Sequence, residues 1–181
     1  MNPDKTFFWS DPHFFHKNII RYCGRPWEFS DAGVLAMNEH LVRVYNSVVP
    51  EDGTCWCLGD FCLGPDKEKT VPELVSRLNG KINLVMGNHD TRPAEFYRDC
   101  GFSKVYDMPV VLEDFIVLSH EPMPFVKAPW FNVAGHVHDN PMFRTFSENG
   151  CIACVERHGY KPVSFRELKL AVTEDDHHSP I

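Results

Sequence analysis

Short apolar runs alternate with amphipathic stretches over the first half of the chain, a pattern typical of strands followed by helices. Runs rich in aromatic and β-branched residues predict buried strands at Thr6–Ser10, Thr54–Leu58 and Ile82–Met86. Apolar residues at helical spacing predict helices from the capping residue Ser30 to about Val48, over Asp66–Leu78, and between Pro93 and Gly101.

Beyond Val105 the helical spacing fades, and short apolar runs separated by turns predict strands at Val110–Leu112, Phe115–Ser119, Phe131–Ala134 and Cys151–Val155. The pattern of Phe165–Val172 fits a strand or a last helix. Early helices followed by clustered strands predict a layered α/β fold with two sheets. We expect one domain over residues 1–172 and a flexible tail over residues 173–181.

Composition narrows the class of protein. The 181 residues are 43% hydrophobic and 24% charged, within the range of globular proteins. No apolar run approaches the roughly 20 residues of a membrane helix, so we expect no membrane association. Met1–Trp9 lacks the long apolar core of a secretory signal, and seven cysteines, an odd number, argue against a disulfide framework. We therefore expect reduced thiols and a cytoplasmic location.

The charge balance bears on the ligand. With 18 basic and 25 acidic residues, the formal net charge is −7. Because phosphate contacts by basic residues supply most of the affinity for long nucleic acids, we do not expect such a partner. A small phosphate ester remains compatible, since bound cations concentrate positive charge in one place.

The candidate chemistry lies directly after predicted strands. Five segments share this position: Asp11-Pro12-His13, Gly59-Asp60, Gly87-Asn88-His89-Asp90, Ser119-His120 and Gly135-His136-Val137-His138. Ligands of α/β sheets bind beyond the carboxyl ends of strands, where these side chains would meet. Each segment alone fits a turn or a structural histidine. Their occurrence together favours a metal site built from carboxylate, amide and imidazole groups.

In this order, the segments resemble those of the calcineurin-like metallophosphoesterases, and the resemblance spans residues 6–139. The opening Ser10–Ile20 with Arg25-Pro26 is similar to a small, capless branch of that family found in bacteria and phages. The resemblance implies a four-layer α-β-β-α sandwich of two mixed sheets flanked by helices. That branch commonly has Thr and Gly where Pro12 and Phe15 stand here, which predicts a narrower pocket mouth.

The resemblance also implies two divalent metal ions at the C-terminal ends of the strands. Carried over by motif, the ligands are Asp11, His13 and His138 for the first metal, Asn88, His120 and His136 for the second, and Asp60 as the bridge. Mn²⁺ is the metal we expect first. Fe, Zn²⁺ and Mg²⁺ are alternatives, because the ligand types alone do not choose among them.

A hydroxide bridging the two metals is the nucleophile that the resemblance implies. His89 would stabilise the transition state and protonate the leaving oxygen, and Asp90 would orient the His89 ring. A simple turn-forming role is the alternative for Asp90. His16, Arg21 and Arg92 are candidate phosphate contacts, with a solvated helix face as the alternative for His16 and Arg21.

These features together predict a dimetal phosphodiesterase acting on a small phosphate ester, such as a nucleotide. The reason for a diester is that the core takes up nearly the whole chain and leaves no cap domain to enclose a monoester. Phosphomonoesterase or phosphoprotein phosphatase activity is an alternative, and a non-catalytic metal-binding scaffold is another. His89 favours an enzyme, because a scaffold does not need a histidine that binds no metal. The sequence leaves the oligomeric state open.

Overall fold

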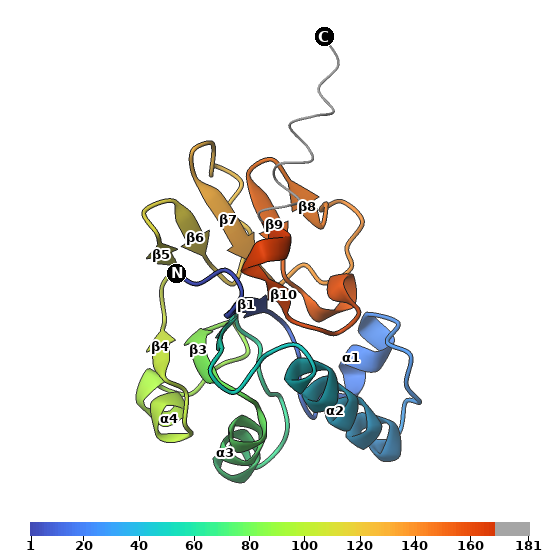
Figure 1. Ribbon diagram of the computed structural model, residues 1–181. Coiled ribbons are helices and arrows are strands. Elements are labelled where there is room, and N and C mark those ends of the chain that lie inside the picture. The colour runs from blue at the N-terminus through green and yellow to red at the C-terminus, as the bar shows by residue number, and fades with distance from the viewer. Residues whose placement is uncertain (169–181) are drawn as a thin grey trace.

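Two mixed five-stranded sheets pack against each other in the computed structural model, which describes residues 1–168 (Figure 1). The first sheet has the order β10-β1-β2-β3-β4 and is built from β1 Thr6–Trp9, β2 Thr54–Cys57, β3 Lys81–Val85, β4 Lys104–Tyr106 and β10 Val163–Ser164. The second has the order β5-β6-β7-β9-β8, from β5 Val110–Leu112, β6 Ile116–Leu118, β7 Phe131–Ala134, β8 Phe146–Ser147 and β9 Gly150–Ile152. The predicted sandwich of two mixed sheets is confirmed.

Strands β1 to β4 run parallel, and β10 joins the sheet antiparallel to β1. In the second sheet β6, β7 and β9 are parallel, while β5 and β8 are antiparallel edge strands. The carboxyl ends of the parallel strands therefore gather at one edge of each sheet. Polar residues that follow these strands are brought close together by this arrangement alone.

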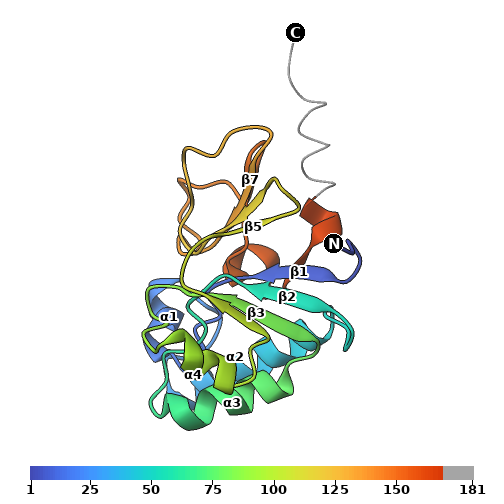
Figure 2. The ribbon, with the colours of Figure 1, turned by 90° about the vertical axis from the view of Figure 1, so that its left-hand side faces the viewer.

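The helices cover one side of the sandwich. Helices α1 Lys17–Tyr22, α2 Asp31–Asn46, α3 Lys67–Arg77 and α4 Ala94–Asp99 lie against the outer face of the first sheet (Figure 2). Ser30 caps α2 as predicted, because its hydroxyl accepts the backbone N–H of Gly33 at 3.0 Å. Among residues 1–168, loops rather than α-helices lie over the outer face of the second sheet.

Strand alternation divides the core into two layers. Phe7 and Trp9 of β1 belong to the cluster between the first sheet and the helices, whereas Phe8 belongs to the cluster between the sheets. On β2, Cys57 faces the helices and Trp56 faces the second sheet. Both faces of the first sheet are therefore buried, which explains the continuous apolar runs of its strands.

The two sheets are joined at their carboxyl ends. The backbone N–H of Ser10, directly after β1, donates to the carbonyl of Ala153 at 2.9 Å, and the N–H of Val155 donates to the Ser10 carbonyl at 3.1 Å. On its other side Asp11 donates its N–H to the carbonyl of Gly59 at 3.2 Å. The chain after β1 thus lies between the two sheets and brings their loops together.

Several short elements were not predicted. Helix α1 has six residues and no side-chain cap, and β4, β8 and β10 are only two or three residues long, too short for a periodic pattern. Residues 165–168 are helical, while the rest of the Phe165–Val172 segment and the tail predicted at residues 173–181 lie outside the described residues. All seven cysteines are free, and six are buried. No helix among residues 1–168 is long and apolar enough to cross a membrane.

Candidate metal centre

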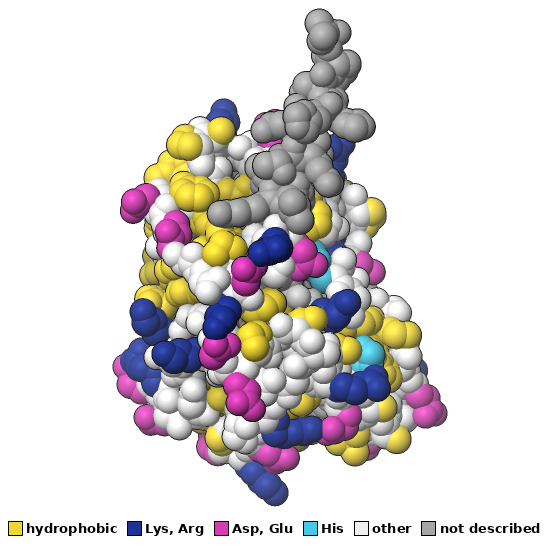
Figure 3. All heavy atoms as spheres, viewed as in Figure 1, with side chains coloured by type: hydrophobic (Ala, Val, Ile, Leu, Met, Phe, Trp, Pro, Cys, Tyr) yellow, Lys and Arg dark blue, Asp and Glu magenta, His cyan; other side chains and the backbone are white. Residues whose placement is uncertain are grey.

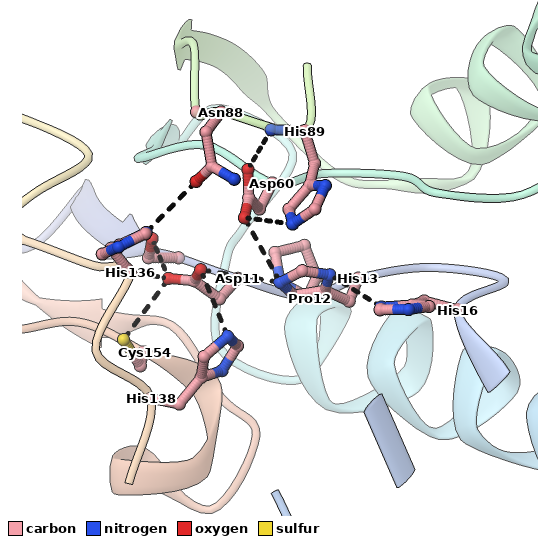
Figure 4. A network of polar contacts seen from close by, with 12 residues as sticks. Asp11, Pro12, His13, His16, Asp60, Asn88, His89, His136, His138 and Cys154 are labelled. Carbon is pink, nitrogen blue, oxygen red and sulfur yellow. Dashed lines mark hydrogen bonds and ion pairs between the residues drawn. The ribbon is translucent and has the colours of Figure 1, made fainter. Parts of the chain in front are cut away.

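The five predicted segments meet at the junction of the sheets, as Figure 4 shows for most of their side chains. Asp11 and His13 follow β1, Asp60 follows β2, and Asn88 and His89 follow β3. His120 follows β6, and His136 and His138 follow β7. The structure therefore brings together all of the residues that the sequence predicts as ligands. These side chains form two groups with the carboxylate of Asp60 between them.

The first group contains Asp11, His13 and His138. Oδ1 of Asp11 lies 3.7 Å from Nε2 of His13 and 3.7 Å from Nε2 of His138, too far for hydrogen bonds. Asp11 and His13 are buried, and among the described residues neither Asp11 Oδ1 nor His13 Nε2 has a hydrogen-bond partner. Buried polar atoms left unpaired are costly, and a cation between them would satisfy both. The three side chains are close enough to hold a metal ion.

Asn88, His120 and His136 form the second group. Nε2 of His120 lies 3.0 Å from Oδ1 of Asn88 and 3.1 Å from Nδ1 of His136, which in turn lies 3.1 Å from Oδ1 of Asn88. Nδ1 of His120 lies 2.7 Å from the carbonyl of Leu58, which can only accept, so this nitrogen carries the proton. A neutral His120 then presents the lone pair of Nε2 to the group, as a metal ligand must.

Asp60 stands between the two groups. Its Oδ2 lies 3.4 Å from Nε2 of His13 and 3.6 Å from Nε2 of His120, while its Oδ1 accepts the backbone N–H of His89 at 2.9 Å. Figure 4 shows the carboxylate pointing between His13 and His89. One carboxylate oxygen thus faces the Nε2 atom of one histidine from each group.

The electrostatics of the first group favour a positive charge. Burial alone would raise the pKa of Asp11, but the nearby imidazoles of His13, His138 and His120 hold it well below its usual range. Burial lowers the pKa of His13. Burial opposes charge on His138 too, yet the neighbouring Cys23 thiol, the hydrogen-bonded Glu156 carboxylate and the charge of Asp11 raise the pKa of His138 to about 10. The carboxylates that stabilise this proton would equally stabilise a metal cation.

The backbone of the site is unusual. Five of the predicted ligands adopt the left-handed conformation that non-glycine residues rarely take: Asp11 (φ 57°), His13 (φ 51°), Asp60 (φ 54°), His136 (φ 67°) and His138 (φ 48°). Such strain costs of order 1–3 kcal/mol per residue and is concentrated at functional sites.

A glycine is required at position 135, because a Cβ there would lie 1.8 Å from Oγ of Ser10 and 2.4 Å from Oδ2 of Asp11. Phe15 is also left-handed, at φ 60°, a conformation that glycine adopts more readily than phenylalanine.

The cluster is open to solvent on one side. Asp11, Asp60 and His120 are buried, whereas Asn88, His89 and His136 are exposed, with 46% of the His89 side chain accessible. Nε2 of His89 lies 4.0 Å from Oδ2 of Asp60. His89 therefore stands at the mouth of the site, where it can contact a group bound over Asp60.

The structure corrects the orienting role predicted for Asp90. Its buried carboxylate accepts the backbone N–H groups of Gly87 and Asp60 at 2.9 and 2.8 Å and that of Phe61 at 3.2 Å, and no hydrogen bond to the His89 ring is found among the described residues. Burial raises the pKa of Asp90 to about 6 in spite of these bonds. Asp90 thus holds the loops after β2 and β3 together, which corresponds to the turn-forming alternative.

His16 is the predicted phosphate contact that lies beside the cluster. Its Nδ1 is 3.2 Å from Nδ1 of His13, and its ring centroid is 6.4 Å from that of His89. Burial, followed by the proximity of His13 and His89, lowers the pKa of His16 to about 4. A neutral His16 is thus placed next to the first group, where it supports the position of the His13 ring.

The two predicted arginine contacts are engaged elsewhere. The guanidinium of Arg21 lies 3.4 Å from the centre of the Phe29 ring. Arg92 forms an ion pair with Glu68 and lies above the Phe96 ring. For Arg21 this placement matches the alternative of a solvated helix face.

Sequence reasoning missed two buried charged residues behind the first group. Oε1 of Glu156 lies 3.1 Å from Nδ1 of His138, and Arg25 donates to the same oxygen from Nη2 at 2.6 Å. Arg25 also donates to the carbonyls of Asp11 and Pro12, both at 2.8 Å. The Arg25-Pro26 pair was a signal in the sequence without an assigned role, whereas nothing in the sequence pointed to Glu156. Cys23, His138 and Glu156 form a further group that could hold a metal ion.

No family model matches the sequence. Among curated proteins, the uncharacterized protein MJ1445 of Methanocaldococcus jannaschii is 41% identical over 90 residues, which is 50% of this chain and 49% of that protein. The gene 66 protein of Mycobacterium phage L5 is 35% identical over 88 residues, 47% of this chain and 39% of that protein. The aligned region thus spans about half or less of the length of these relatives.

Solved structures share the fold. The protein of unknown function AQ665 from Aquifex aeolicus has a TM-score of 0.64 at 24% identity. The aligned region covers 91% of this chain and 97% of the AQ665 chain. The Pseudomonas putida nuclease MPE has a TM-score of 0.50 at 26% identity and covers 75% of this chain and 61% of its own. The chain is therefore similar to a nuclease in fold, and it holds a buried Asp/His cluster able to bind a metal ion.

Proposed function

We propose that this chain is a metal-dependent phosphodiesterase of the calcineurin-like metallophosphoesterase class. The observation that carries the proposal is the arrangement of two groups of metal-binding atoms about Asp60, one at His13 and one at His120. The first group contains buried polar atoms without a hydrogen-bond partner. In the second group, Oδ1 of Asn88 and nitrogens of two histidines face one another. Both features fit two bound cations better than a network of hydrogen bonds with a purely structural role. Mn²⁺ is the metal we propose first, and the same donors also suit Fe, Zn²⁺ and Mg²⁺.

Asp11, His13 and His138 would hold one cation, Asn88, His120 and His136 the other, and Asp60 both. When bound, such a pair activates water at neutral pH and binds the oxygens of a phosphate ester. The carboxylates carry the negative charge that would keep both cations in place. Ser10 and Cys154 hold Oδ2 of Asp11 at 2.6 and 3.3 Å and leave Oδ1 free to bind a metal.

His89 is the general acid in this proposal. It is exposed at the mouth of the site, and its backbone N–H is fixed by Asp60, so the ring can reach the leaving oxygen of a bound ester. The ring lies 5.6 Å, centre to centre, from that of His13. A histidine so placed would stabilise negative charge on the departing oxygen and then donate its proton.

Two observations support a diester as substrate. The bond that a nuclease cleaves is a phosphodiester, and the nuclease MPE shares the fold of this chain. The site is also open at Asn88, His89 and His136, which leaves room for two ester substituents. Basic and acidic side chains are interspersed on the face shown in Figure 3. The formal net charge of −7 supports a small ester rather than a long nucleic acid as ligand.

Hydrolysis of bis-p-nitrophenyl phosphate and p-nitrophenyl phosphate in the presence of Mn²⁺ tests the proposal. We expect release of p-nitrophenol from the diester at a kcat/KM above that for the monoester. Hydrolysis of the monoester alone would establish a phosphatase instead. Binding of two metals per chain without turnover of either substrate would favour the non-catalytic scaffold.

A further inference from the structure

A hollow of about 750 Å³ lies beside the metal centre on the second sheet. Residues 121–124 and 142–144 line it from two loops, and β7 and β9 contribute Asn132 and Ile152. Asn132 alternates with Phe131 and Val133, which face the other sheet, so the hollow is on the outer face of the sandwich. Its size is within the roughly 300–1,000 Å³ of typical ligand sites.

Both walls of the hollow are held in place by buried or half-buried side chains. On one side, Oδ1 of Asn132 accepts the backbone N–H of Met123 at 2.9 Å, and its Nδ2 donates to Oγ of Ser119 at 3.0 Å. On the other side, Arg157 donates to the carbonyls of Phe143 and Asn140 at 2.9 and 2.7 Å. A hollow with fixed walls loses little freedom when a ligand enters it.

The hollow borders the candidate metal centre through His136. This residue lines the hollow, and its Nδ1 belongs to the second group of metal-binding atoms, 3.1 Å from Nε2 of His120. Val137, next in the chain, lines the hollow as well. A phosphate bound over the metals would therefore have one of its ester substituents beside the opening.

The lining is chemically mixed in a way that suits an aromatic group with polar edges. Met123, Met142 and Phe143 supply apolar and polarisable surface, and Met142 and Phe143 are 89% and 39% exposed. Thioether sulfurs and aromatic rings both pack favourably on aromatic rings. Arg144 and Asn149 supply hydrogen-bonding groups. A methyl substituent is too small to reach either set of groups.

We propose that this hollow binds the nucleoside substituent of a phosphodiester whose phosphate lies at the metal centre. The inference rests on the proposed function, because the phosphate is placed by the metals. It goes further in placing the nucleoside in this hollow and in naming Met142 and Phe143 as the residues that contact the base.

Two substrates with the same leaving group test the inference: thymidine 5′-(p-nitrophenyl) phosphate and methyl p-nitrophenyl phosphate. We expect kcat/KM to be about tenfold higher for the thymidine ester, the scale that stacking of one base contributes. Met142→Ala with Phe143→Ala should remove most of this preference through KM and leave the rate on the methyl ester unchanged. Leu35→Ala is the control, because Leu35 is a 57% exposed apolar residue of α2 that does not line the hollow.

The methyl ester separates the two proposals. Turnover of both esters at equal kcat/KM, with no effect of the double variant, would overturn the nucleoside site and leave the phosphodiesterase intact. Absence of turnover of both esters would contradict the proposed function. In that case, calorimetric titration with thymidine 5′-phosphate and methyl phosphate still tests the hollow. About tenfold tighter binding of thymidine 5′-phosphate than of methyl phosphate, the scale expected for stacking of one base, would support the nucleoside site. The difference should be lost in the double variant. Equal binding of the two compounds would overturn the nucleoside site.

Discussion

Glu156 and His138 are joined behind the candidate metal centre, with Oε1 of the carboxylate 3.1 Å from Nδ1 of the imidazole. The carboxylate can only accept while it is ionised, so Nδ1 carries a proton and Nε2 faces Oδ1 of Asp11, 3.7 Å away. This arrangement of carboxylate and histidine fixes the tautomer and the orientation of a metal-binding ring. Glu156 is therefore a positioning residue for His138.

Glu156→Gln should weaken metal binding at the first group by about 10–100-fold, the usual effect of losing such a carboxylate. Calorimetric titration of metal-stripped protein with Mn²⁺ measures this directly. Glu148→Gln changes an exposed carboxylate and should leave the Mn²⁺ affinities of both groups unchanged. Equal affinities in all three proteins would show that Glu156 does not position His138 for a metal.

Arg25 should matter for stability more than for chemistry. Its side chain is fully buried and pairs with Glu156, whose side chain is 5% exposed. Arg25→Met leaves a buried carboxylate without its cation, which costs about 3–5 kcal/mol of the free energy of unfolding. Urea denaturation measures the loss, and Arg25→Met combined with Glu156→Gln should recover part of it, since no charge is then left unpaired.

The exposed Arg77–Glu39 pair provides the control for Arg25. Arg77→Met should cost only about 0–1 kcal/mol, because solvent screens this pair. Similar losses for Arg25→Met and Arg77→Met would mean that the buried pair is not the structural support that its burial indicates.

Asp90→Ala should destabilise the protein. Three backbone N–H groups would lose their acceptor, at about 1–3 kcal/mol for each that stays buried and unpaired. Thermal unfolding checks this, with the exposed Asp99→Ala as control. Unchanged stability with strongly reduced turnover would instead restore the role in orienting His89.

His89→Ala should lower turnover without lowering stability, the opposite of the result expected for Asp90→Ala. The side chain is half-exposed, so stability and metal content should stay as in the unchanged protein. Turnover of bis-p-nitrophenyl phosphate should fall by about 10²–10⁴, the usual contribution of a general acid. His40→Ala on α2 is the control for loss of a histidine remote from the site. An unaffected rate in His89→Ala would remove the general-acid role.

Much of this arrangement could be predicted from the sequence, because it depends on local signals. The aromatic and β-branched runs gave the central strands, and the polar residues directly after them gave the cluster at Asp11, Asp60 and His120. Topology then brings such residues together, since parallel strands share one carboxyl edge. The same reasoning explains why His136 and His138, from the second sheet, complete the site once Ser10 joins the two sheets.

What the sequence could not supply are contacts between distant, isolated residues. Glu156, which follows β9, contacts His138, which follows β7. Arg25 contacts Glu156 from the loop after α1. No periodic pattern in the sequence connects these three residues. Asp90 was misassigned because a carboxylate next to His89 fits both a catalytic and a turn-forming role. Only the direction of its side chain, toward Gly87 and Phe61, separates the two.

The proposed function requires that this chain hydrolyses phosphodiesters with two bound metal ions. Its most direct test is a titration of metal-stripped protein with Mn²⁺ while hydrolysis of bis-p-nitrophenyl phosphate is followed. We expect no turnover without metal and a rate that reaches its plateau at about two equivalents per chain, as a two-metal site requires. Full activity of the stripped protein in the presence of a chelator would contradict it.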